Sequence, residues 1–127
     1  MEKTIIVGGK EIKMKASALV PRLYRFKFGR DMLSDLSKLE KAFNKKRDLP
    51  KDATEEEIQE AELSALDLTI FENTAFVMAK LGDPESVPET VDAWMDGFEI
   101  FSIYEALPQI LELWKMSNQT TAIPKKN

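Results

Sequence analysis

Two short runs near the start of the chain have residue patterns that are typical of strands. These runs are residues 4–7 and 11–14, and the pair Gly8-Gly9 stands between them. Because glycine accepts the positive φ angles of the tight turns that join twisted strands, the pattern predicts a β-hairpin. Isoleucine and methionine alternate with charged residues in the second run, so one face is expected to be buried. A lone hairpin is only marginally stable in water, and we therefore expect it to pack on helices.

The spacing of apolar residues becomes helical after residue 20. Pro21 is expected to be the first residue of a helix, because its fixed φ suits that position. Gly29 is expected to end this helix in the left-handed conformation, and Asp31 can cap the next helix with its carboxylate. The apolar stripe of the second helix consists of Met32, Leu36, Leu39 and Phe43. Residues 44–52 are mostly charged and include a proline, which predicts a loop.

A long third helix is predicted from Thr54 to Leu81. Thr54 and Glu57 form a capping-box pattern, in which the hydroxyl accepts from an amide three residues later and the carboxylate reaches back. From Leu63 onward, apolar residues cover this helix on most sides, as expected for a helix at the centre of a fold. The sequence Gly82-Asp83-Pro84 is expected to stop it.

Two further amphipathic segments follow. Ser86 and Glu89 form a second capping-box pattern, and the apolar residues after it share one helical face. These residues are Val91, Trp94, Met95 and Phe98. The last apolar stripe consists of Phe101, Tyr104, Leu107, Leu111 and Trp114. Pro108 falls inside that stripe, where it either kinks a helix or starts a new one.

These elements predict an α+β fold, mainly α, with an N-terminal β-hairpin followed by about five helices around one core. The length of 127 residues suits a single domain, which we place at residues 1–119. The chain is polar from Ser117 onward, and residues 120–127 are expected to form a flexible basic tail.

The residue types that are missing narrow the chemistry. The chain has no cysteine and no histidine, which removes disulfides, thiolate ligands, the commonest general base and the commonest ligand of transition metals. Gly8-Gly9-Lys10 lacks the spacing of a phosphate-binding loop, and Glu56 and Glu60 lack the histidine partners of di-iron bundles. We therefore expect no catalytic residue, no cofactor and no bound metal. Apolar runs are short, so neither a membrane span nor a secretory signal is expected.

The net charge of −4 conceals an uneven distribution. Residues 1–47 hold 13 Lys and Arg against 5 Asp and Glu, a net charge of +8, whereas residues 48–114 hold 2 Lys against 17 Asp and Glu, a net charge of −15. Opposite charges of this size attract one another within one molecule or between copies. Neutralisation within the fold is the simpler interpretation, but we also expect a weak homo-oligomer whose association falls as salt rises.

Residues 22–30 interleave cations with aromatic rings. Surfaces that bind nucleic acid combine such residues, because bases stack on rings and phosphates attract arginine. An amphipathic helix with its rings in the core produces the same pattern. We favour that second interpretation because the rest of the chain is acidic.

Four segments carry a more specific pattern. The first is Tyr24-Arg25-x-Lys27-Phe28-Gly29-Arg30-Asp31, and the second comprises Ile70-Phe71-Glu72-Asn73 and Met78-Ala79-Lys80. The third is Trp94 with Phe98-Glu99-x-Phe101-Ser102-Ile103-Tyr104-Glu105, and the fourth is Leu107-Pro108-Gln109-Ile110-Leu111-Glu112-Leu113-Trp114. In this order and spacing they resemble the tail assembly chaperones of long-tailed, siphovirus-type phages and prophages of Gram-positive bacteria, over most of the chain.

The resemblance implies a protein of the host bacterial cytoplasm that binds the apolar stripes of the helical tape-measure protein. Such chaperones then yield to the tail-tube protein and are absent from the mature virion. They are often also made in a longer, frameshifted form. The codons for Lys125-Lys126-Asn127 can form a slippery run, although a plain basic tail explains these residues equally well.

Partners are expected to bind by helix-in-groove recognition at aromatic and charged residues of these segments. The candidates are Tyr24, Arg25, Phe28, Arg30, Asp31, Trp94, Phe101, Tyr104 and Trp114. Two alternatives of other classes stay open. One is a structural tail component that is retained in the virion, and the other is a small phage regulator that binds nucleic acid through residues 22–30.

Overall fold

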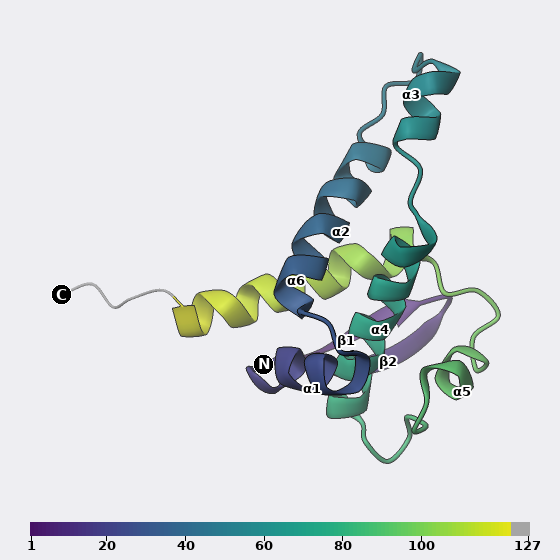
Figure 1. The fold of residues 1–127 in the computed structure, drawn as a ribbon. Coiled ribbons are helices and arrows are strands. Elements are labelled where there is room, and N and C mark those ends of the chain that lie inside the picture. The colour runs from purple at the N-terminus through teal and green to yellow at the C-terminus, as the bar shows by residue number, and fades with distance from the viewer. Residues whose placement is uncertain (123–127) are drawn as a thin grey trace.

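Within the described residues, 1–122, the chain folds as an N-terminal hairpin followed by six helices, which confirms the predicted α+β, mainly α class. The structure is a computed structural model, and it describes side chains through Asn118. Figure 1 shows the arrangement of the elements. They are β1 (Glu2–Val7), β2 (Lys10–Lys15), α1 (Leu19–Phe28), α2 (Met32–Arg47), α3 (Glu55–Glu60), α4 (Ala65–Gly82), α5 (Val91–Met95) and α6 (Ile103–Ala122).

The hairpin forms as predicted. Strands β1 and β2 pair antiparallel with Ile5 opposite Ile12. Gly8 and Gly9 take φ angles of +59° and +80° in the turn between the strands. Both angles are positive, as a type I′ turn requires. The inward face of the hairpin is buried and consists of Ile5, Val7, Ile12 and Met14.

Helix α4 lies at the centre of the fold, as its apolar residues predicted. It contacts β2, α1, α2, α5 and α6, and Figure 1 shows these elements around it. Its last residue, Gly82, lies so close to β2 that a β-carbon there would be 2.7 Å from the carbonyl carbon of Lys13. Glycine is therefore required for the helix to approach the strand this closely.

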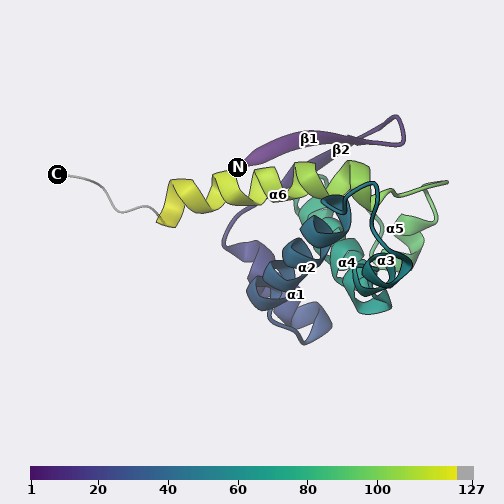
Figure 2. The same ribbon diagram turned by 90° about the horizontal axis from the view of Figure 1, so that it is seen from above.

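Helix α6 covers the free edge of β1, and Figure 2 shows it running beside the hairpin. The amide of Ile6 donates to Oε1 of Gln109 at 3.1 Å, and Nε2 of Gln109 donates to the carbonyl of Ile6 at 2.9 Å. The amide of Gly8 donates to the Glu105 carboxylate at 2.6 Å. These side chains satisfy backbone groups that a bare strand edge would leave unpaired.

The boundaries of the first two helices differ from the prediction. Helix α1 begins at Leu19, so Pro21 is its third residue and not its first. Helix α2 continues to Arg47, and only the last part of the loop predicted at residues 44–52 lies outside a helix. The exposed outer side of the last turn of α2 is charged, so its helical character was invisible in the apolar pattern.

The long helix predicted from Thr54 is interrupted. The capping box of Thr54 and Glu57 is confirmed, but α3 ends at Glu60. A second capping box, formed by Ser64 and Asp67, starts α4. The prediction overlooked this second signal because apolar residues continue across the break.

The capping box predicted at Ser86 is wrong. Thr90 caps α5 instead, and its hydroxyl accepts from the amide of Ala93 at 3.1 Å. Helix α6 runs through Pro108 without starting anew and continues to Ala122, which is beyond the expected domain end at residue 119. Residues 123–127, which include the basic end of the expected tail, lie outside the described residues.

Candidate partner-binding surfaces

The motif at residues 24–31 builds the corner between α1 and α2. Gly29 ends α1 with a left-handed φ of +68°, and its amide donates to the carbonyl of Arg25 at 2.8 Å. The Asp31 side chain accepts from the amide of Leu33 at 3.1 Å and caps α2. Both roles were predicted from the sequence and are confirmed.

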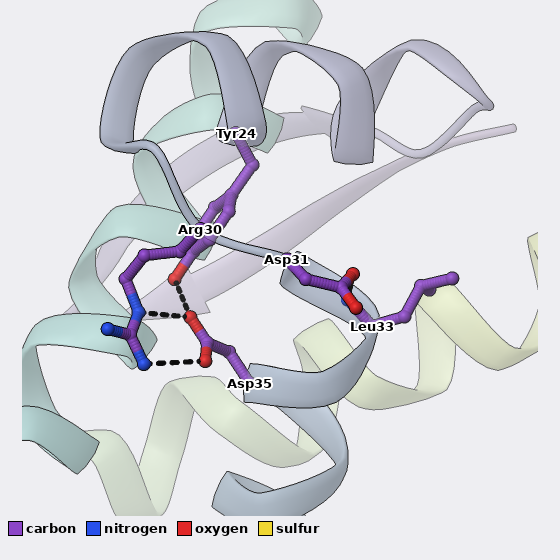
Figure 3. A network of polar contacts seen from close by, with 5 residues as sticks. All are labelled: Tyr24, Arg30, Asp31, Leu33 and Asp35. Atoms are coloured by element: carbon purple, nitrogen blue, oxygen red, sulfur yellow. Dashed lines mark hydrogen bonds and ion pairs between the residues drawn. The ribbon is translucent and has the colours of Figure 1, made fainter.

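A buried carboxylate, Asp35, ties this corner together (Figure 3). Asp35 accepts from the Tyr24 hydroxyl at 3.0 Å and from two nitrogens of Arg30 at 2.7 and 2.9 Å. Two parallel contacts between a guanidinium and a carboxylate make a strong and well-oriented pair. Helix α1, the corner and α2 each contribute one of the three side chains, so the network fixes how the two helices meet.

The network also shifts the pKa values of Asp35 and Tyr24. Hydrogen bonds from Arg30 lower the pKa of Asp35, and they outweigh the effect of its burial. Burial, reinforced by the hydrogen bond to Asp35, raises the pKa of Tyr24. At neutral pH, Asp35 is therefore ionised and Tyr24 keeps the proton that it donates.

Most candidates in this motif have partners inside the molecule. Tyr24 is fully buried, and the ring of Phe28 packs edge-on against it with the centroids 5.2 Å apart. Arg30 and Asp31 are occupied by the contacts that form the corner. Arg25 is exposed, and no carboxylate of the described residues lies within ion-pair distance of it.

The aromatic candidates near the C-terminus divide between the core and the surface. Trp94 and Phe101 pack with their rings 5.2 Å apart, inside a cluster of aromatic residues. Trp114 is buried as well. Tyr104 is 53% exposed, and its ring lies 5.7 Å from the ring of Phe43. The other members of the cluster are Phe71, Phe76 and Phe98.

A groove of about 480 Å³ lies between α2 and α6, near Tyr104. We call it the α2–α6 groove. Phe43 and Leu111 form its apolar floor, and the exposed side chain of Met116 lies at its edge. An ion pair between Lys115 and Glu40 joins the two helices beside it. The lining residues are Glu40, Phe43, Asn44, Arg47, Pro108, Leu111, Glu112, Lys115 and Met116.

The outer face of α1 exposes apolar side chains to water. Phe26 is 88% exposed and Leu19 is 43% exposed. Leu23 lies between them and is half-buried. These three residues have the spacing of one helical face, and we call them the α1 stripe. The expectation that the rings of this helix lie in the core is correct for Tyr24 but wrong for Phe26.

Cations and a cavity accompany the α1 stripe. Arg22 and Arg25 are exposed beside it. A cavity of about 230 Å³ lies between α1 and α4, and the ammonium of Lys27 sits 5.5 Å from the centre of the Phe76 ring there. The cavity is lined by Leu23, Phe26, Lys27, Phe76, Val77, Lys80 and Glu89.

The α1 stripe and the α2–α6 groove were not among the predicted sites. A signal for the stripe was present, since Leu19, Leu23 and Phe26 recur at helical spacing. It was masked by Tyr24 and Phe28, which define the inward side of the same helix. The groove has no local signal, because it exists only where two helices far apart in the sequence cross.

In residues 1–122, no three Asp or Glu side chains gather closely enough to hold a metal ion. Over the same residues, no helix combines the length and apolar character needed to cross a bilayer. Comparison of the chain with protein-family models, with curated proteins and with solved structures gives no match.

Proposed function

We propose that this chain is a phage tail assembly chaperone. In this role it binds the tape-measure protein without catalysis and helps to recruit tail-tube subunits. The resemblance of the four segments between residues 24 and 114 supports the family. The protein would act in the cytoplasm of the host bacterium and leave before the virion is complete.

The α2–α6 groove is the observation that supports a binding site for a helix of the client. Grooves between helices accept the apolar face of an amphipathic helix. Phe43 and Leu111 provide an apolar floor, and Tyr104 and Met116 expose further apolar surface at its edges. Tyr104 is the predicted candidate that lies both on the surface and beside this groove.

A shallow groove suits a client that must later be released. The tape-measure protein offers a long apolar stripe that needs cover only until the tail tube surrounds it. Affinity depends on tightly packed anchors and not on area alone. A floor that is itself largely buried gives few such anchors, so each contact would be weak and many copies would act together.

Co-expression with the client tests the proposal. The expected gene neighbourhood has a tail-tube gene upstream and a gene for a very long coiled-coil protein downstream, and that long protein is the client. We expect the wild-type chain to keep a client segment soluble and to co-purify with it. Replacing Tyr104 and Met116 by serine should lower capture several-fold while the protein keeps its helical circular dichroism signal, because both side chains lie on the surface.

The matched control replaces two exposed apolar residues elsewhere. Ile6 and Ile100 are 52% and 74% exposed, and their change to serine should leave capture intact. Equal loss in both variants would contradict the groove as the binding site. Failure of the wild-type chain to capture any client segment would contradict the chaperone function itself.

Analysis of purified phage particles distinguishes the chaperone from a structural tail component. A chaperone should be absent from mass spectra of mature virions and present in lysates of infected cells. A stoichiometric amount in the virion would support the structural alternative.

Binding of nucleic acid through α1 is the second candidate function. The exposed ring of Phe26 beside Arg22 and Arg25 is the observation that favours it. Protein purified without nuclease should then absorb strongly at 260 nm, and fluorescence anisotropy should detect binding to a labelled single-stranded oligonucleotide.

A further inference from the structure

We infer that helix α3 of one copy docks on the α1 stripe of a second copy, so that the protein associates head to tail. The occupant is a second molecule of this chain, and the contact does not depend on the identity of the client.

The α1 side of this contact is apolar and positively charged. Phe26 is 88% exposed, which leaves almost the whole ring in water. Helix α1 carries Arg22, Arg25 and Lys27 and no acidic residue. Arg22 and Arg25 have no ion-pair partner among the described residues. The stripe therefore lacks an apolar cover, and Arg22 and Arg25 lack counter-charges, whereas Lys27 lies beside Glu89 and donates to its carbonyl.

Helix α3 has the complementary properties. Its sequence is Glu-Glu-Glu-Ile-Gln-Glu, with four carboxylates and no cation. None of its six residues is buried, and Ile58 is 39% exposed. A single helix this short is unstable in water without packing. Its capping box holds the first turn, but no element of the described residues covers its outer side.

The two helices cannot meet within one molecule. Helix α1 precedes the N-terminal end of α2 and α3 follows its C-terminal end, and α2 has 16 residues, which corresponds to roughly 24 Å of helix. Figure 1 shows α3 at the tip of the arm that α2 forms, with α1 at the other end of α2. A contact between them must therefore join two copies, and each copy keeps one free end for the next.

The spacing of the charged and apolar residues fits this docking. Glu55 and Ile58 are three residues apart on α3, and Arg22 and Phe26 are four residues apart on α1. Such positions are neighbours on one helix face. The cavity of about 230 Å³ beside Phe26 has room for one aliphatic side chain, and Ile58 is the apolar residue that α3 carries. Exposed ion pairs of this kind are weak and are screened by salt.

Two variants, each lacking one half of the contact, test the inference. The α1 variant carries Arg22→Ser and Phe26→Ser, and the α3 variant carries Glu55→Gln and Ile58→Ser. All four side chains are exposed, so both variants should melt at or near the wild-type temperature in circular dichroism. The control variant carries Lys41→Ser and Ile100→Ser, which removes a cation and an apolar residue from other exposed positions.

Light scattering after size-exclusion chromatography measures the outcome. At low salt, the mass of the wild-type and control proteins should rise with concentration, and it should return to the monomer mass as salt approaches about 0.5 M. Each docking variant alone should remain monomeric. An equimolar mixture of the two variants should reach twice the monomer mass and no more, because only one of the two possible contacts is intact.

Three results would overturn the inference. The first is a wild-type monomer at every concentration and salt. The second is a dimer of the α3 variant alone, which would mean that two α1 stripes pair symmetrically through Phe26. The third is a wild-type monomer that binds a labelled single-stranded oligonucleotide and loses that binding in the α1 variant, which would make α1 a surface for nucleic acid.

Discussion

Helices α3 and α4 begin with the same sequence signal, but α4 is largely buried and α3 is exposed. Each starts at a capping box in which both reciprocal hydrogen bonds are present. Helix α4 buries eight of its 18 residues, whereas α3 buries none of its six. The comparison teaches that a cap determines where a helix begins, while packing determines how stable the helix is.

The same contrast holds between two parts of the protein, the body, formed by the hairpin, α4 and α6, and the arm, formed by α2 and α3. The order of the body depends on apolar contacts and on the close approach of α4 to β2. The tip of the arm depends on capping bonds and on two ion pairs, from Lys46 to Glu62 at 2.5 Å and from Arg47 to Asp48 at 3.2 Å. We therefore expect the tip of the arm to open locally while the body unfolds as one unit.

The largest effect is expected at Gly82, where the body is most tightly packed. In Gly82→Ala the new methyl group would overlap the backbone of β2 at Lys13 and Met14. Overpacking of this kind costs about 1–3 kcal/mol or more, because backbone atoms must move. Chemical denaturation should show a clear loss of stability. Gly97→Ala is the control, since its β-carbon would be 3.3 Å from the nearest backbone atom, and an equal loss there would contradict the packing argument.

A smaller loss is expected where the body joins the arm, at Asp35. Asp35→Asn removes the charge that pairs with Arg30 and holds Tyr24, which should cost about 1–2 kcal/mol at neutral pH. The folded-state pKa of Asp35 is lowered, so its stabilising contribution is complete above the unfolded pKa of about 3.9 and is lost as pH falls through the folded pKa.

Chemical denaturation of the wild type and of Asp35→Asn at several pH values tests this predicted pH dependence of stability. The stability difference should be constant from pH 6 to pH 8 and should shrink at acidic pH, below about 4. A difference that grows as pH falls would contradict the role of the ionised carboxylate. Tyr24→Phe keeps the ring and serves as a control, because it should reduce stability while leaving the acid-side dependence on Asp35 in place.

The corner itself should be sensitive to a side chain at Gly29. Its φ of +68° is a left-handed conformation that β-branched residues rarely adopt. Gly29→Val should therefore lower stability by about 1 kcal/mol or more. Gly29→Asn should cost less, because asparagine tolerates this conformation. Open space surrounds the position, so equal losses in the two variants would point to a cause other than backbone conformation.

The two capping boxes offer the most direct test of the comparison between α3 and α4. Ser64→Ala removes the cap of a packed helix and should lower global stability by about 1 kcal/mol. Thr54→Ala removes the same kind of cap from α3 and should leave the global denaturation midpoint unchanged within error. Hydrogen exchange should instead become faster at residues 55–60 alone. A fall in global stability for both variants would show that α3 is coupled to the body.

Part of the corner between α1 and α2 could be predicted from the sequence and part could not. The cap at Asp31 and the turn at Gly29 follow from residue types that suit those positions, and both are confirmed. The burial of Asp35 could not be foreseen, since an acidic residue is ordinarily expected at the surface. Its place inside depends on Tyr24 and Arg30, which the fold brings to it.

The candidate sites show the same division. Aromatic residues marked the motifs, but the fold places Tyr24, Trp94 and Trp114 inside and Phe26 outside. A ring at helical spacing can serve the core or the surface, and the sequence does not state which side of the helix meets its neighbours. That choice follows from how α1 lies on α4.

By itself the sequence determined the class of fold, the hairpin with its Gly8-Gly9 turn, the apolar stripe of α2 and the central place of α4. These features depend on residues within a few positions of one another, or on how apolar a whole segment is. Only the tertiary structure decided which side of α1 is buried, and that a groove opens between α2 and α6. Both outcomes depend on contacts between residues far apart in the chain, and local patterns of polarity carry no information about such contacts.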